Sequence, residues 1–442
     1  MNRPAPGMGY VGVAVVLLAT TSQSLATWSI CLTDSATKEV AVGTVTCLDN
    51  LDLLELVPVV VVGKGTGACQ SAGDLFGTRR PIIFNGLING TAPADILVSL
   101  AGVVGHQQRQ YGIADTQGRT ITFSGSQNAQ WAGGVTGLDG SLAYAIQGNI
   151  LAGSCVVPAI EQAVLTTAGD MPAKLMAGME AARANGGDGR CSCSQANPTS
   201  CGCPPASFTK SGHIGGMVVS RIGDADDSVC NADGCADGDY FMRLNVSFQP
   251  VGATDPVLQL QALFDAWRAA LVGRPDAIQS EVEFSPPTAP PDGASSLTMQ
   301  ISLRDWSGSA IGVAISDLTV LHSPDSAGIS SIGVVTDEGG GDFSVVLTAG
   351  TSAGIDRFVV TVDDGIRPVV LMPEPSLRYF DFGDMDCSGA VDVGDVGPFA
   401  QALVDPDAYA GAFPLCHVGL AAVGGGGPDG GAIQNFVDLL LN

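Results

Sequence analysis

The residue best suited to nucleophilic chemistry in this chain is Thr27. It follows Ser24-Leu25-Ala26, a small-x-small sequence typical of the site at which a secretion signal is removed. Cleavage there would leave an N-terminal threonine that carries a hydroxyl and an α-amine with a pKa of about 7.7–8.0. Thr27 could then supply both the nucleophile and its general base, although threonine is also an ordinary first residue of a β-strand.

Residues 1–26 are predicted to form that signal peptide. Arg3 supplies the charged start, and Val11–Ala19 form the apolar stretch. No later apolar run reaches the roughly 18–20 residues that a membrane span needs. We therefore expect a secreted, periplasmic or cell-surface protein with no membrane span after signal removal.

The composition limits the partners of the chain. It holds 19 Lys plus Arg against 44 Asp plus Glu, a net charge of −25. Such an excess of acid argues against nucleic acid or an anionic membrane as a partner. The length of 442 residues predicts two or three domains once the signal is removed.

Twelve cysteines in an exported chain predict disulfides, because an oxidising compartment preserves them. Six of them lie between Cys191 and Cys235, the first four in a cysteine-rich segment, residues 191–209. Paired cysteines can also bind zinc, but C-x-C spacing without nearby histidines favours disulfides. We expect a loop stapled by its own bridges.

Periodicity predicts an α+β domain over residues 27–275 that begins with two strands around a polar turn. The Leu51–Val62 run is expected to be a further buried strand. A proline-rich stretch at Ser285–Pro291 predicts a linker over residues 276–296. Alternating strand-like runs over residues 297–376 then predict a small all-β sandwich, and residues 381–442 a short helical module. Strands are expected at Thr27–Asp34, Glu39–Cys47, Gln110–Gly125, Gly140–Ile150, Ile214–Arg221 and Tyr240–Phe248, and helices at Ala92–Val103, Pro158–Ala168 and Pro172–Ala184.

Oxygen ligands recur in the C-terminal segment at the spacing of a calcium loop. Gly389 stands at the sharp turn, and Ca²⁺ prefers about 6–8 hard oxygens in a loop that can wrap it. The alternative is a solvated acidic turn without an ion. A second half, Gly424–Leu441, retains only Asp429 as a charged candidate, so we expect one structural Ca²⁺ and not two. The expected ligands at loop positions 1, 3, 5, 7, 9 and 12 are Asp384, Asp386, Ser388, the carbonyl of Ala390, Asp392 and Asp395.

Six short motifs in the first half of the chain together resemble the domain of unknown function family 1028. Members of that family look like N-terminal-nucleophile (Ntn) hydrolases. The resemblance implies an αββα sandwich, in which two antiparallel sheets lie between helical layers and the first strand presents Thr27 into a cleft. The motifs are Thr27–Ile30, Val40–Gly43, Arg109–Asp115, Trp131–Gly133, Gln147–Leu151 and Gly186–Asp188.

The resemblance implies a secreted amide (C–N) hydrolase, with a small-molecule or peptide amide as its substrate. Thr27 would attack the carbonyl, and preorganised donors would stabilise the oxyanion. Asn149 and Gln147 are the candidates for oxyanion and amine-orienting roles, with Gln70 next. For these amides the alternative is a buried turn satisfied by backbone hydrogen bonds.

Three other residues of the motifs are expected to have structural roles. Trp131 is expected in the core, Arg109 in an ion pair and Asp188 in a turn.

Two departures from the family pattern leave other readings open. The cysteine-rich segment interrupts the sequence after Gly-Gly-Asp, and Ser247-Phe248-Gln249 replaces an acidic-acidic-histidine run. The second hypothesis is therefore a non-catalytic secreted binding or surface-interaction protein on an inactive Ntn fold.

The C-terminal half carries two weaker resemblances. Leu297–Val370 resembles the immunoglobulin-like repeats of bacterial surface proteins through Val346–Thr351, which implies a spacer, or an adhesin as a third reading. The acidic loop resembles a dockerin-type calcium repeat, which implies a possible protein partner. Dockerins normally use two such loops.

Overall fold

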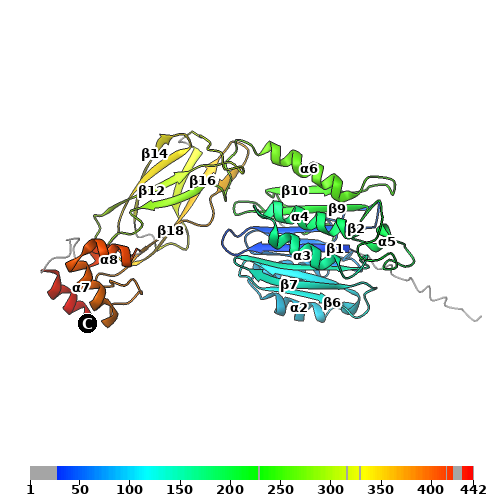
Figure 1. The fold of residues 1–442 in the computed structure, drawn as a ribbon, viewed down its shortest axis with the longest axis horizontal. Helices are drawn as coiled ribbons and strands as arrows, with labels where there is room; N and C mark the ends of the chain where they lie inside the picture. The colour runs from blue at the N-terminus through cyan, green and yellow to red at the C-terminus, as the bar shows by residue number, and fades with distance from the viewer. Residues whose placement is uncertain are drawn as a thin grey trace, which may run out of the picture.

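The computed structural model describes residues 27–226, 229–314, 317–327, 330–414, 416–421 and 431–441. The predicted signal peptide, residues 1–26, lies outside the described residues, as do residues 424–430 of the second calcium-like half. The described chain forms three bodies in a row, a large layered domain, a β-sandwich and a small helical module (Figure 1).

The first sheet of the large domain has six antiparallel strands in the order β10-β9-β2-β1-β8-β7. The predicted first strand β1 lies in the interior of this sheet, hydrogen-bonded to β2 on one side and β8 on the other. Every residue of β2 and β8 is buried. The strands are β1 (Thr27–Asp34), β2 (Val40–Thr46), β7 (Gly133–Asp139), β8 (Leu142–Asn149), β9 (Ile214–Ser220) and β10 (Met242–Val246).

A second, four-stranded sheet in the order β3-β4-β5-β6 faces the first. Side chains of a strand alternate between faces, so the odd residues of β1 point toward this second sheet. Thr33 Oγ1 donates to the carbonyl of Asp115 at 2.8 Å, while Trp28 and Ile30 point to the opposite, helical side. Only the end of the Leu51–Val62 run is a strand. The strands are β3 (Pro58–Val61), β4 (Gly65–Gln70), β5 (Gln110–Asp115) and β6 (Thr120–Ser124).

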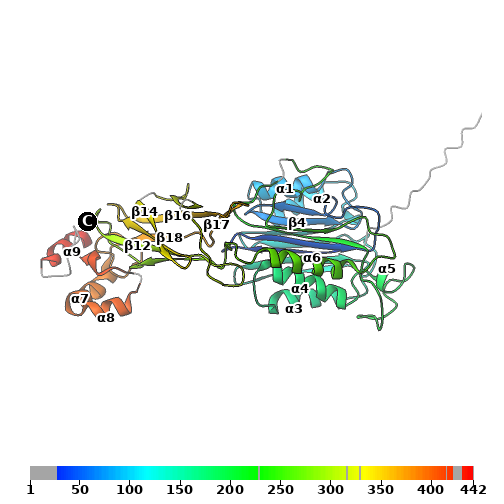
Figure 2. The same cartoon turned by 90° about the horizontal axis from the view of Figure 1, so that it is seen from above.

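Helices cover the outer faces of both sheets, so the domain has four layers (Figure 2). Helices α3, α4 and α6 pack on the six-stranded sheet, and α1 and α2 pack on the four-stranded sheet. Asp170 and Asp255 cap α4 and α6 by accepting backbone N–H groups of their first turns at 3.2 and 2.9 Å. The helices are α1 (Arg80–Ile88), α2 (Pro93–Ala101), η1 (His106–Gln108), α3 (Val156–Thr166), α4 (Met171–Ala184), α5 (Gly189–Ser192) and α6 (Pro256–Ala270).

The cysteine-rich segment is fastened to the domain core, which corrects the expectation of a loop held only by its own bridges. Cys47–Cys191 joins it to the end of β2, and Cys155–Cys203 joins it to the start of α3. Only Cys193–Cys201 closes a bridge inside the segment. Cys230–Cys235 is a separate local bridge. The disulfides therefore clamp both ends of the segment.

Two four-stranded sheets around one apolar core form the β-sandwich. It begins earlier than its sequence pattern indicates, because β11 lies inside the range predicted to be linker and pairs with β12. The strands are β11 (Glu281–Ser285), β12 (Ser296–Ser302), β13 (Leu318–His322), β14 (Ser331–Gly339), β15 (Asp342–Thr348), β16 (Gly354–Asp363), β17 (Pro368–Val370) and β18 (Ser376–Tyr379).

Short helices around a small aromatic core form the C-terminal module. The rings of Phe399 and Phe436 stack at 3.9 Å between centroids and join its first and last α-helices. The helix that follows the acidic loop spans Val396–Val404. The helices are η3 (Val393–Asp395), α7 (Val396–Val404), α8 (Pro406–Ala412), η4 (Val418–Ala421) and α9 (Ala432–Leu440).

Among the described residues, no helix combines the length and apolar character needed to cross a membrane.

The bridging pattern predicts unequal contributions of the disulfides to stability. Cys47 and Cys191 are 144 positions apart, and Cys193 and Cys201 only 8. Loop-closure entropy then gives losses of about 5 kcal/mol for Cys47→Ala/Cys191→Ala and about 2.5 kcal/mol for the control Cys193→Ala/Cys201→Ala. Urea unfolding of both double variants measures the two losses. Equal losses of stability would show that loop-closure entropy does not determine how much each disulfide stabilises the fold.

Candidate functional site

Thr27 occupies the end of the buried strand β1, between two polar neighbours. It pairs with Thr46 of β2 on one side and with Asn149 of β8 on the other. The backbone nitrogen of Thr27 donates to Oδ1 of Asn149 at 3.2 Å, and Thr27 is 1% exposed. The sheet therefore brings together the two residues that the sequence placed first among the site candidates.

Gln70, at the end of β4, joins the two sheets at this point. Its Nε2 donates to the carbonyl of Thr27 at 2.9 Å and to Oε1 of Gln110 at 2.6 Å. Its Oε1 accepts from Ser29 Oγ at 2.5 Å. Gln70 is fully buried, and each of its amide atoms has a partner, as a buried amide requires. Gln70 thus fixes the backbone of the candidate nucleophile.

Further amides and hydroxyls extend this network. Gln110 Nε2 donates to the carbonyl of Gly148 at 2.8 Å, and Asn149 Nδ2 donates to Ser71 Oγ at 3.3 Å. Ser71 in turn donates to Asn128. The sequence analysis did not single out Ser29, Ser71, Gln110 and Asn128 as site residues. Ser29 could have been found, because it lies two residues after Thr27 and therefore faces the same side.

Gln147 lies one pleat further from the strand end. It pairs with Ser29 and packs on Gly112 of β5, so closely that a Cβ at Gly112 would lie 1.9 Å from its Oε1. Gln147 is fully buried, and its amide atoms have no hydrogen-bond partner among the described residues. The structure therefore brings Asn149 and Gln70 to Thr27, and it places Gln147 deeper between the sheets.

Asp188 anchors a guanidinium beside the Thr27–Thr46 pair. Its Oδ2 accepts the backbone N–H of Cys47 at 2.8 Å and pairs with Arg190 Nη2 at 2.8 Å. Nη2 of Arg190 lies 3.4 Å from Thr46 Oγ1. Asp188, expected to be a turn residue, thus also positions a charged side chain next to the site.

Of the other motif residues, Trp131 packs against the domain core as predicted. The sequence predicts an ion pair for Arg109, and the structure shows a different environment. Its Nε and Nη1 are buried without a hydrogen-bond partner among the described residues, and burial, followed by the charge of Arg79, lowers its pKa.

The acidic loop of the C-terminal module brings three carboxylates together. Oxygens of Asp384, Asp386 and Asp395 lie within 4.8 Å of one another. Burial raises the pKa of Asp384, and the charges of Asp395 and Asp386 add to the rise. Hard oxygens at this spacing fit a Ca²⁺ ion. Asp392, the fourth predicted carboxylate ligand, lies outside this close group.

The loop is also braced by its own backbone. Asp395 Oδ1 accepts the N–H groups of Met385 and Asp386 at 2.6 and 2.9 Å, and Asp384 Oδ2 accepts that of Gly389 at 2.9 Å. Ser388 Oγ donates to the carbonyl of Ala390 at 3.2 Å. An ion would add to a loop that is already ordered by these bonds.

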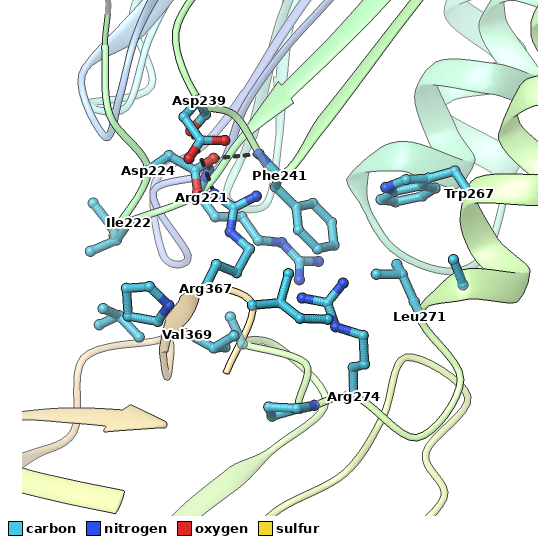
Figure 3. A pocket seen from close by; sticks show the side chains of 16 residues that line it. Arg221, Ile222, Asp224, Asp239, Phe241, Trp267, Leu271, Arg274, Arg367 and Val369 are labelled. Atoms are coloured by element: carbon cyan, nitrogen blue, oxygen red, sulfur yellow. Dashed lines mark hydrogen bonds and ion pairs between the residues drawn. The ribbon is translucent and has the colours of Figure 1, made fainter. Parts of the chain in front are cut away.

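A separate cavity of about 210 Å³ lies between the large domain and the β-sandwich (Figure 3). Its three arginines, Arg221, Arg274 and Arg367, are already paired. Arg221 binds Glu39 at 2.8 Å and Asp276 at 2.9 Å, while its guanidinium lies over the ring of Phe241. Arg367 pairs with Asp224 across the domain boundary. We assign this cavity to the junction between the domains.

The junction cavity is remote from Thr27. Arg221 follows the last residue of β9, whereas the first residue of β9 pairs with Thr46, the partner of Thr27. Seven strand residues span about 20 Å at roughly 3.3 Å per residue. The two places therefore lie at opposite ends of the same sheet.

Two facing antiparallel sheets covered by helices, with a buried hydroxyl and amide network at one end, define a layered α+β domain. Residues 27–197 match the model of a family of unknown function, DUF1028. This part of the chain is therefore a DUF1028 domain, as the motifs indicated. No curated protein matches the chain in sequence.

Several solved structures show a limited likeness. Protein SPO2555 from Silicibacter pomeroyi, a DUF1028 protein, is 18% identical with a TM-score of 0.39, and the match covers 55% of this chain and 88% of that one. The adhesin InvE from Yersinia pseudotuberculosis is 20% identical with a TM-score of 0.19, covering 23% and 26%. The Lin-41 filamin domain is 17% identical with a TM-score of 0.19, covering 24% and 95%.

The network around Gln70 predicts a loss of stability on its removal. Gln70→Leu keeps the approximate size but removes the Gln70 bonds to Gln110, to the carbonyl of Thr27 and to Ser29, of which Ser29 retains its bond to Thr44. Each buried polar group left unpaired costs about 1–3 kcal/mol, so we expect a loss of several kcal/mol in urea unfolding. Gln261→Leu, which removes an exposed bond to Asp265 on α6, is the control and should change little. Equal small effects would mean that water replaces the Gln70 contacts.

Proposed function

We propose that the chain is a secreted N-terminal-nucleophile hydrolase that cleaves an amide (C–N) bond with Thr27. The contact between the Thr27 nitrogen and Asn149 Oδ1 carries this proposal. After cleavage of the Ala26–Thr27 bond, that nitrogen becomes an α-amine, and Asn149 then orients the amine on the same residue as the hydroxyl. The four-layer arrangement also supports an Ntn-type sandwich.

The proposed reaction needs only a few groups. The Thr27 amine takes the proton of its own hydroxyl, and Oγ1 attacks the carbonyl carbon of the amide to form a tetrahedral oxyanion. Collapse expels the amine product, which takes the proton, and leaves an ester on Thr27. Water, activated by the same amine, then hydrolyses the ester and releases the acid. Gln70 holds the Thr27 backbone still during these steps, through its bond to the Thr27 carbonyl.

A non-catalytic binding protein on the same fold is the second candidate. The observation that favours it is the Ser247-Phe248-Gln249 segment, which follows β10 where related sequences carry acids and a histidine. Phe248 is 61% exposed and offers an apolar contact in place of a charged one. The two candidate functions differ in whether the protein hydrolyses an amide with Thr27 as the nucleophile.

Thr27→Ala should abolish hydrolysis, because the remaining amine cannot replace the hydroxyl nucleophile. Loss of a catalytic nucleophile can reach about 10⁶-fold. A panel of N-acyl amino acids and acyl p-nitroanilides provides the assay, after N-terminal sequencing has shown that the secreted protein starts at Thr27. Thr27→Ser should keep measurable turnover.

Thr33→Ala is the matched control, because Thr33 lies on the same strand and face as Thr27 but donates its hydroxyl hydrogen bond to the carbonyl of Asp115. Asn149→Ala should lower kcat more than it raises KM. Activity of Thr27→Ala above a few per cent of wild type would reject Thr27 as the nucleophile. A wild-type protein that is inactive across the panel but starts at Thr27 would favour the binding protein.

We further propose that the loop Asp384–Asp395 binds one structural Ca²⁺ in a dockerin-like module. Carboxylates that converge without an ion repel one another, and the ion removes that repulsion. Such a module offers a surface for a protein partner, and the β-sandwich serves as an immunoglobulin-like spacer.

Calcium should raise the unfolding temperature of the C-terminal module and leave that of the DUF1028 domain unchanged. An ion that binds only the folded state stabilises it by RT ln(1 + [L]/Kd). Titration calorimetry should count one ion per chain, and Asp384→Ala/Asp395→Ala should abolish the response. Asp407→Ala, at an exposed position of α8, is the control. A count of two ions or of none would contradict a single intact loop.

A further inference from the structure

A cavity of about 580 Å³ lies at the same end of the six-stranded sheet as Thr27. We call it the insertion pocket, because the cysteine-rich segment forms one wall through Cys191 and Gln195. The end of β2, the start of α6 and residues 209–213 form the others. Its volume lies within the range of about 300–1,000 Å³ that small-molecule sites occupy.

The insertion pocket begins one residue away from the strand partner of the nucleophile. Thr46 pairs with Thr27, and Cys47, the next residue, lines the pocket. Arg190 lines it too and reaches Thr46 Oγ1 at 3.4 Å. The backbone N–H of His213, another lining residue, donates to the carbonyl of Thr46 at 2.8 Å. The pocket therefore begins beside the strand pair that holds Thr27.

The side chains that face the pocket are mainly hydrogen-bond donors and cations. Lys210 is one of only four lysines in a chain of net charge −25, and it lines the pocket together with Arg190. Its ammonium donates to the Val251 carbonyl at 2.7 Å, which holds it at the rim. An anionic group in the pocket would meet both cations.

Two acids lie nearby, and both are already bonded: Asp255 lines the pocket, and Asp188 pairs with Arg190. Asp188 is fully buried against Arg190, and Asp255 is 2% exposed. Asp255 Oδ2 accepts from the nitrogen and Oγ of Ser211 at 2.6 and 2.9 Å. These hydrogen bonds brace the pocket wall.

His213 provides an independent sign of a missing ligand. It is 8% exposed, lines the pocket, and its Nδ1 has no hydrogen-bond partner among the described residues. Burial lowers its pKa, and the charge of Lys210 lowers it further, so the ring is neutral and can donate from one nitrogen. A buried polar atom without a partner is rare and is usually satisfied by water or a ligand.

A zinc ion does not account for this cluster. Atoms of Cys47, Cys191 and His213 lie within 4.8 Å of one another, but the two cysteines form a disulfide. Zinc binds thiolates, which a disulfide does not provide.

We infer that the insertion pocket binds a carboxylate of the substrate, so that Thr27 acts on amides of small organic acids. This inference rests on the proposed hydrolase. Lys210 and Arg190 supply the charge, His213 supplies a hydrogen bond, and Val251 and Leu258 line the pocket where a short aliphatic chain would lie. The cysteine-rich segment thereby has a role in substrate selection.

The test measures binding apart from hydrolysis. The Thr27→Ala protein is titrated with glutarate and with glutaramide, its neutral counterpart, by calorimetry and ligand-observed NMR. Glutarate should bind at least about tenfold more tightly than glutaramide, and Lys210→Gln should weaken it by about tenfold, as expected for the loss of a charged contact. Lys174→Gln is the control, since the Lys174 ammonium likewise donates to a backbone carbonyl, that of Thr167. Equal binding of the two ligands, or an unchanged affinity in Lys210→Gln, would overturn the inference.

A second pair of variants tests the same inference in case Lys210→Gln fails to fold. Leu258 is 43% exposed and lines the pocket, whereas Leu263, on the same helix, is 41% exposed and does not. Leu258→Glu should abolish glutarate binding by repulsion, and Leu263→Glu should leave it intact. Equal binding by both variants would overturn the inference even if Lys210→Gln failed to fold.

Turnover by the wild-type protein separates this inference from the proposed function. Faster hydrolysis of N-acyl amino acids than of their neutral amide counterparts would support both. Equal rates on the two substrates, with no glutarate binding, would refute the carboxylate site and leave the hydrolase standing. Glutarate binding as expected, with amide hydrolysis undiminished in Thr27→Ala, would refute the nucleophile and leave the site in place.

Discussion

The rule that buried polar groups must be paired governs the end of this domain that holds Thr27. Thr27, Ser29, Gln70 and Gln110 are all buried between two sheets, where an unpaired amide or hydroxyl costs about 1–3 kcal/mol. Their hydrogen bonds therefore hold the sheets in one register and the start of β1 in one position. The same constraint that stabilises the sandwich fixes the geometry around Thr27, so architecture and site cannot vary independently.

Much of the layered domain could be predicted from periodicity. The first two strands and the helices α2, α3 and α4 lie within a few residues of their predicted ranges, because each has a clear turn or cap signal. The sequence analysis does not predict helix α6, although Asp255 caps it and Pro256 begins it. The sequence predicts linker at β11 because the prolines that follow it, from Pro286 to Pro291, dominate the local composition.

The site could be predicted only where the chemistry lies in one residue or motif. Thr27 stands out by position, and Asn149 by its place in a motif that the family shares. The contacts of Gln70 and Arg190 depend on which strands become neighbours, and local sequence does not determine this. Disulfide partners are hidden for the same reason, since Cys47 and Cys191 meet only after β2 and α5 have docked.

The bond between Cys47 and Cys191 gives the insertion pocket a dependence on cellular location. It is the only described disulfide that ties the pocket wall to the end of β2, and it forms where oxidants are available. In the reducing cytosol that wall has no covalent tie to the strand, and Thr27 still carries its leader under the proposed maturation. Two covalent events, one cleavage and one oxidation, would then have to coincide before the site is complete. The proposed hydrolase would then be inactive inside the cell that makes it.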